Sequence, residues 1–67
     1  MTMKQDVLRK QVRRIKAEYD DIRYYDLAEY IGITEASFYN WLQGYYSLSS
    51  KRANKLHEIA IDLLELN

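Results

Sequence analysis

The feature that most constrains this chain is the very short interval between two helical segments. Over residues 24–31 the apolar positions follow the period of a single helix face: Tyr24, Leu27, Ala28 and Ile31. Gly32 comes next and accepts the left-handed backbone that ends a helix. Only Ile33 and Thr34 then precede a further helix, predicted for residues 35–43. So short a connection forces a sharp turn, and the two helices must therefore cross tightly.

Residue types at this crossing agree with that geometry. Ala28 is small, as is needed where two helices touch, and Thr34 is a good N-cap for the second helix. The flanking positions are apolar, and we expect them to hold the pair on the core: Leu27, Ile31, Ile33, Phe38 and Trp41. On the opposite side of the second helix, an arc of about 140° carries Glu35, Ala36, Tyr39, Asn40 and Gln43.

Longer amphipathic helices are predicted on either side of the pair. The first covers about residues 4–19 and ends at Asp20-Asp21; its apolar stripe is Leu8, Val12, Ile15 and Tyr19, widened by Val7. Gly44 stops the third helix, and residues 45–48 are expected to form a loop. The last helix is capped by Ser49 or Ser50 and runs toward Leu66, with a core face of Leu56, Ile59, Ala60 and Leu63. No alternating run predicts a strand, so the fold class is all-α with four helices.

Composition narrows the classes of protein that remain. The 67 residues allow one domain, and the absence of Cys excludes a disulfide framework and any thiolate metal site. No apolar run is long enough to span a membrane. Residues 1–6 lack the apolar stretch of a secretory signal, so we expect a cytoplasmic protein with no membrane partner.

Although the formal net charge is zero, basic and acidic segments alternate along the chain. Residues 1–16 carry six basic residues and one acidic residue, whereas residues 17–36 carry six acidic residues and one basic residue. Residues 37–55 then have a net charge of +3, and residues 56–67 a net charge of −3. A nucleic-acid-binding protein is usually basic. Separated blocks nevertheless allow a basic face on a neutral protein, or simply keep the chain soluble.

Residues 27–44 resemble the signature of the lambda-repressor-like helix-turn-helix family. The matching positions are Leu27-Ala28, then Gly32-Ile33-Thr34, then Phe38, and finally Trp41 before Gln43-Gly44. The later residues Lys55-Leu56, Ile59-Ala60 and Leu63 are similar to that family's fourth helix, so the resemblance covers roughly residues 22–64.

This resemblance implies a repressor-type transcriptional regulator, commonly phage-encoded for so short a chain, that places its third helix in the major groove of DNA. The implied base contacts are Glu35, Ala36, Tyr39 and Asn40, and the implied backbone contacts include Thr34 and Gln43. Asn can bond adenine through two hydrogen bonds, and a helix N-terminus can bind a phosphate. Further phosphate contacts are expected from cations outside the third helix: Arg23, Lys51, Arg52 and Lys55.

One departure from a DNA-reading surface favours a different function. The third helix has no Lys or Arg, and its single formal charge is Glu35, which repels phosphate. With Tyr39, Tyr45 and Tyr46 nearby, this composition also suits a protein interface. The alternative is a helix-turn-helix module that binds another repressor or a host protein, such as a phage antirepressor or an anti-CRISPR protein.

The basic residues of the first helix are open to two interpretations. Arg9, Lys10, Arg13 and Arg14 either add to phosphate attraction or form a solvated face with partners one turn away, such as Asp6 with Lys10. The last helix carries Ile61 outside its predicted core arc and Leu64 at the edge of that arc. These two residues predict a homodimer interface, as expected of a protein that binds two half-sites.

Catalysis has no support in the sequence. There is no Cys nucleophile, no pair of metal-binding His residues and no Gly-rich phosphate loop. His57 is the chain's only His and is expected to be structural or solvated. We therefore expect a protein that is not an enzyme and that needs neither a metal nor a cofactor.

Overall fold

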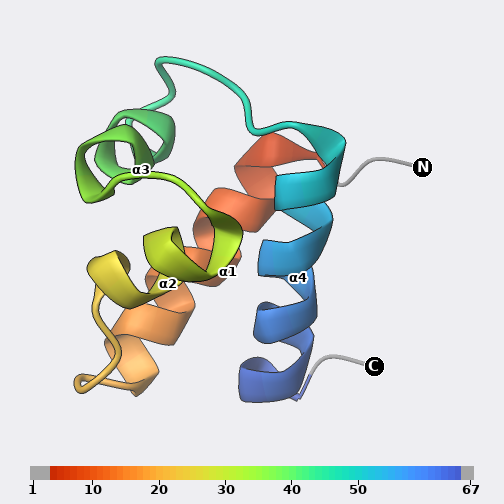
Figure 1. Cartoon of the computed structure of the whole chain (residues 1–67). Helices are drawn as coiled ribbons and strands as arrows, with labels where there is room; N and C mark the ends of the chain where they lie inside the picture. The colour runs from red at the N-terminus through yellow and green to blue at the C-terminus, as the bar shows by residue number, and fades with distance from the viewer. Residues whose placement is uncertain (1–3, 66–67) are drawn as a thin grey trace.

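A computed structural model of the chain describes residues 4–65, and these residues form four helices and no strand (Figure 1). The helices are α1 (Gln5–Glu18), α2 (Tyr24–Ile31), α3 (Glu35–Leu42) and α4 (Ser50–Leu64). The all-α prediction is thus confirmed, with each described helix boundary within one or two residues of its predicted position. The predicted extension of the last helix to Leu66 lies outside the described residues.

The helices are arranged so that α3 lies at one edge of the molecule. The two long helices α1 and α4 pack against each other, and α2 contacts both α3 and α4. In Figure 1, α3 stands apart from α4, and the chain between them runs as a long connection over the top of the view. Because α3 packs mainly against α2, one of its faces remains open to solvent.

A continuous apolar core joins all four helices. Trp41 and Phe38 are its largest fully buried side chains, which confirms their predicted core role. The rings of Phe38 and Trp41 lie 5.4 Å apart, and Tyr24 lies 5.7 Å from Phe38. A second, smaller cluster joins Ile15 of α1 to α4 at the C-terminal ends of both helices. Its buried residues are Ile15, Ala60 and Leu64.

Two predictions about buried positions were wrong. Val7 does not widen the stripe of α1, because only the side carrying Leu8 is covered, and Val7 is exposed. The buried face of α4 is rotated from the predicted one, so Ile59 and Leu63 are only partly buried. The residues buried on α4 are instead Ala53, Leu56, Ala60 and Leu64. Leu48 lies in the predicted loop, and its side chain is buried in the core.

Hydrogen bonds with the Gln5 side chain hold the loop at Leu48 in place. The side-chain oxygen of Gln5 accepts a hydrogen bond from the Trp41 indole Nε1 at 2.7 Å and another from the Leu48 backbone N–H at 3.0 Å. Its side-chain nitrogen also contacts the Leu48 carbonyl at 3.4 Å. One polar side chain at the start of α1 thereby satisfies a buried indole and anchors the connection between α3 and α4.

The turn between α2 and α3 has the geometry expected from its residues. Gly32 has φ +84° and follows the last residue of α2. The backbone N–H groups of Gly32 and Ile33 both donate to the Ala28 carbonyl, at 2.9 and 3.0 Å, and so close the end of the helix. Thr34 then starts α3, because its hydroxyl oxygen accepts from the Ser37 N–H at 3.1 Å.

None of the helices within residues 4–65 is both long and apolar enough to cross a bilayer.

Candidate nucleic-acid interface

The open face of α3 carries all four predicted base-contact residues. Glu35, Ala36, Tyr39 and Asn40 are exposed, while Phe38, Trp41 and Leu42 on the other side are buried. Gln43, the residue that ends α3, is also exposed. The prediction that these five polar or small residues share one exposed face is therefore confirmed. Their contact with DNA stays a prediction.

Thr34 is positioned by its own helix. In addition to its role as a cap, its hydroxyl donates to the Ser37 Oγ at 3.0 Å. The N–H groups of Glu35 and Ala36 follow in the first turn, where a helix leaves its donors without helical partners. An anion at this end of α3 would thus meet backbone donors of the first turn more readily than the Thr34 hydroxyl.

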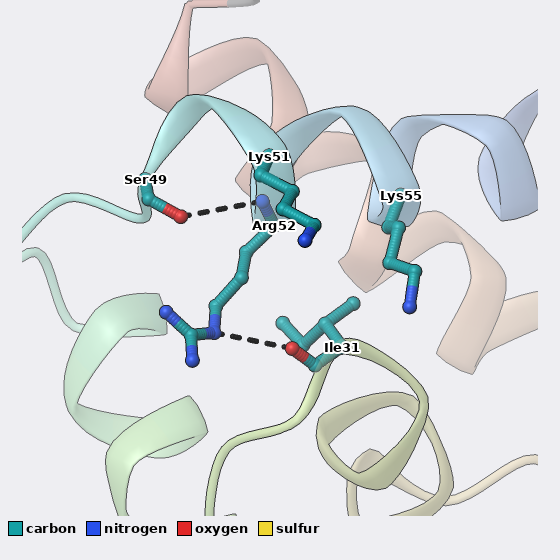
Figure 2. Close-up of a pocket in the computed structure, with 5 residues that line it drawn as sticks. All are labelled: Ile31, Ser49, Lys51, Arg52 and Lys55. Carbon is teal, nitrogen blue, oxygen red and sulfur yellow. Dashed lines mark hydrogen bonds between the residues drawn. The ribbon is translucent and has the colours of Figure 1, made fainter.

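A basic pocket lies where the end of α2 meets the start of α4 (Figure 2). Its volume is about 240 Å³, and its lining is Ile31, Ser49, Lys51, Arg52 and Lys55. The Ser49 hydroxyl accepts from the Arg52 backbone N–H at 3.3 Å, and the Arg52 Nε donates to the Ile31 carbonyl at 3.1 Å. The Lys55 ammonium lies 5.4 Å from the Tyr30 ring centre. Three of the four predicted phosphate-binding cations are therefore gathered in one place.

The fourth of these cations is elsewhere. Arg23 precedes α2 and is exposed, but it does not line the basic pocket. Its backbone N–H donates to the Asp26 carboxylate at 3.0 Å, which caps the first turn of α2.

A second pocket, which sequence reasoning missed, is acidic. It has a volume of about 290 Å³ and is lined by Tyr25, Glu29, Ile33, Thr34 and Glu35. The Glu29 carboxylate raises the pKa of the Tyr25 hydroxyl, first by hydrogen bonding to it and then by its negative charge; desolvation, Asp26 and Glu35 add to the shift. This acidic pocket lies directly beside the first turn of α3.

A sequence signal for this acidic character was available in the charge count. Residues 24–48 contain no Lys or Arg, three carboxylates and six of the chain's seven Tyr residues. Several of the tyrosines are exposed, Tyr45 most of all at 78%. Two of these exposed tyrosines also make contacts within the chain: the Tyr46 hydroxyl donates to the Ser37 carbonyl at 2.8 Å, and Tyr39 meets Tyr24 edge-on at 5.3 Å.

The two predicted dimer-interface residues differ in exposure. Ile61 is 37% exposed on α4 and is available to a partner. Leu64 is only 7% exposed, because it packs with Ile15 and Ala60 in the smaller core cluster. The Leu64 side chain is buried within its own chain, so the prediction that it lies in a dimer interface was wrong. Of the two predicted interface residues, only Ile61 remains a candidate.

His57 Nδ1 lies 3.1 Å from the Gln11 side-chain oxygen, linking α4 to α1. Within residues 4–65, no cluster of three or more His, Cys, Asp or Glu residues is placed to hold a metal ion.

Comparison with known proteins returns no relative. No protein-family model, no protein of curated function and no solved structure matches this chain at a significant level.

Proposed function

We propose that this chain is a DNA-binding regulator with a lambda-repressor-like helix-turn-helix fold, in which α3 enters the major groove. The observation that carries the proposal is the combination of a tight turn between α2 and α3 with an exposed, mostly polar face on α3. Asn40 is the residue on that face best suited to read a base, because its amide both donates and accepts. Glu35 suits an accepting role toward the cytosine amino group.

Phosphate attraction in this proposal comes from the basic pocket. Lys51, Arg52 and Lys55 line the pocket with Ile31, the last residue of α2, and Arg23 adds a fourth cation before α2. Four phosphate contacts give a slope of about −3.6 for log K against log salt, so affinity falls roughly 100-fold between 50 and 200 mM salt. The proposal also includes a homodimer on two half-sites, with Ile61 in the interface.

The test is selection of bound sequences from random duplex DNA by the purified protein, followed by a salt titration on the selected duplex. Lys51→Gln and Lys55→Gln should each flatten the salt slope by about one and weaken all duplexes alike. Arg14→Gln is the matched control, because Arg14 is an exposed α1 cation paired with Glu18 at 2.6 Å and outside the pocket. A wild-type protein that enriches no sequence and shifts no duplex at low salt would rule out this function.

A specific observation favours a second candidate, a module that binds a protein. The region around α2 and α3 has three carboxylates, no Lys or Arg, and several exposed tyrosines, a composition closer to protein interfaces than to DNA interfaces. Its partner would be another repressor or a host protein with a basic surface. Failure of the duplex selection, together with saturable and salt-sensitive binding to a basic protein, would favour this second candidate.

A further inference from the structure

The carbonyl ends of both α2 and α3 are capped by arginines that come from other helices. Neither helix has a basic residue in its own last turn. Arg52 of α4 donates to the Ile31 carbonyl at the end of α2. From α1, Arg9 donates to the Trp41 carbonyl at 2.6 Å and Arg13 to the Leu42 carbonyl at 3.0 Å. Cations at a helix C-terminus are favourable because the unpaired carbonyls carry partial negative charge.

Arg9 makes the most extensive of these contacts. Besides Trp41, its guanidinium donates to the Tyr46 carbonyl at 2.9 Å and to the Asp6 carboxylate at 3.0 Å. The guanidinium carbon also lies 5.3 Å from the centre of the Trp41 ring. Only 11% of the side chain is exposed. One planar group thus fixes the last turn of α3 and the following connection relative to α1.

Two of the last four backbone carbonyls of α3 accept hydrogen bonds from arginines of α1. Backbone N–H groups of the connection bond the Tyr39 and Asn40 carbonyls. The Trp41 carbonyl is shared between the Gly44 N–H and Arg9, and the Leu42 carbonyl accepts from Arg13. Together with the burial of Trp41 and its indole bond to Gln5, these bonds restrain how the C-terminal end of α3 is oriented.

We propose that Arg9 is a positioning residue for the exposed face of α3, with Arg13 in support. Its rigid fork of donors sets the orientation of α3, so a residue far from that face determines how well the face fits its target. A lysine keeps the charge but not the planar fork, and therefore does not replace it. The inference deepens the proposed function and rests on it for the DNA readout described next.

The experiment compares Arg9→Lys with Arg14→Lys, a matched control on the same helix whose guanidinium is exposed and pairs with Glu18 of α1. The first readout is amide hydrogen exchange. In Arg9→Lys, the N–H groups of Gln43, Gly44 and Tyr45, which bond the end of α3, should exchange at least about tenfold faster relative to those of α4. Arg14→Lys should leave this ratio unchanged.

The second readout is sequence discrimination, which a purely stabilising contact does not alter. Loss of folded protein weakens all duplexes equally, whereas a displaced α3 weakens the matched duplex most. The affinity ratio between the selected duplex and a duplex with one changed base pair should fall about threefold or more in Arg9→Lys. Arg14→Lys should keep the wild-type ratio. Should Arg9→Lys not fold, Arg13→Lys takes its place in both measurements.

Two results overturn the proposal. One is unchanged exchange at the end of α3 in Arg9→Lys. The other is faster exchange with full discrimination, because Arg9 then only stabilises the protein. If the wild-type protein selects no duplex, the proposed function fails separately, and unchanged exchange at the end of α3 in Arg9→Lys still overturns the role of Arg9 independently of DNA binding.

Discussion

Replacing Gln5 by Ala tests the polar connection between α1 and the α3–α4 loop most directly. The substitution removes the acceptor of two hydrogen bonds, from the Trp41 indole and from the Leu48 backbone N–H. Trp41 is 0% exposed, so its indole donor would be left buried without a partner. Each unsatisfied buried donor costs about 1–3 kcal/mol, and partial entry of water at the half-buried Gln5 reduces the total to about 2–4 kcal/mol.

That loss is large for a chain of this size. At about 0.05–0.15 kcal/mol per residue, the free energy of unfolding of the whole domain is about 3–10 kcal/mol. Urea unfolding followed by helical circular dichroism should therefore show a much lower midpoint for Gln5→Ala. The exposed Gln43→Ala is the control and should stay within about 0.5 kcal/mol of wild type.

Gln5→Glu tests whether the stability depends on the acceptor oxygen of Gln5 and not on its side-chain nitrogen. A carboxylate retains an oxygen for both donors and is favoured in the first turn of a helix. We expect a loss of about 1 kcal/mol or less, because the remaining contact to the Leu48 carbonyl is already long at 3.4 Å. A Gln5→Ala protein as stable as the Gln43→Ala control, or a Gln5→Glu protein as unstable as Gln5→Ala, would refute the reasoning.

Four other predictions concern separate features. Asn40→Ala should cost about 1–3 kcal/mol of DNA-binding free energy and relax preference at one base pair; a uniform loss across all sequences in a binding assay would contradict base reading. Ile61→Asp should give a monomer, and an unchanged mass by light scattering would remove Ile61 from the interface. Gly32→Ala should destabilise the fold by about 1–2 kcal/mol in urea unfolding, because Gly32 has φ +84° and no atom near its missing Cβ, so backbone strain is the whole cost. Glu29→Gln should lower the raised pKa of Tyr25 toward 10.0, measured as tyrosinate absorbance against a Tyr25→Phe reference. Because the folded state holds this proton more tightly than the unfolded chain, Tyr25 should reduce stability as pH rises above about 10, and a gain in stability there would contradict the assignment.

Much of the fold could be predicted because its signals are local. The period of Leu8, Val12 and Ile15 marks one helix face, and Gly32 marks the end of another. Thr34 and Ser49 act as the caps that their residue types predict. These features depend on a few residues that are neighbours in the sequence, and so they can be predicted without knowledge of the tertiary packing.

The mistaken predictions concern positions whose environment depends on distant segments. Val7 and Leu64 are both apolar, and their place on a helix does not say how far the neighbouring helix extends. Packing between α1 and α4 leaves Val7 uncovered and buries Leu64 against Ile15. The burial of Leu48 depends in the same way on Gln5, which is 43 residues away in the chain.

For the candidate site, the sequence by itself determined which residues share the open face of α3, because helix periodicity fixes that face. It also determined that this face has no Lys or Arg. Only the tertiary structure decided what the basic residues of α1 do. Arg9 and Arg13 bond the carbonyl end of α3, whereas Lys51, Arg52 and Lys55 gather in a pocket at the end of α2. A charge has the same sign wherever it lies in a sequence, but its partner depends on which helix end the fold brings within hydrogen-bond distance.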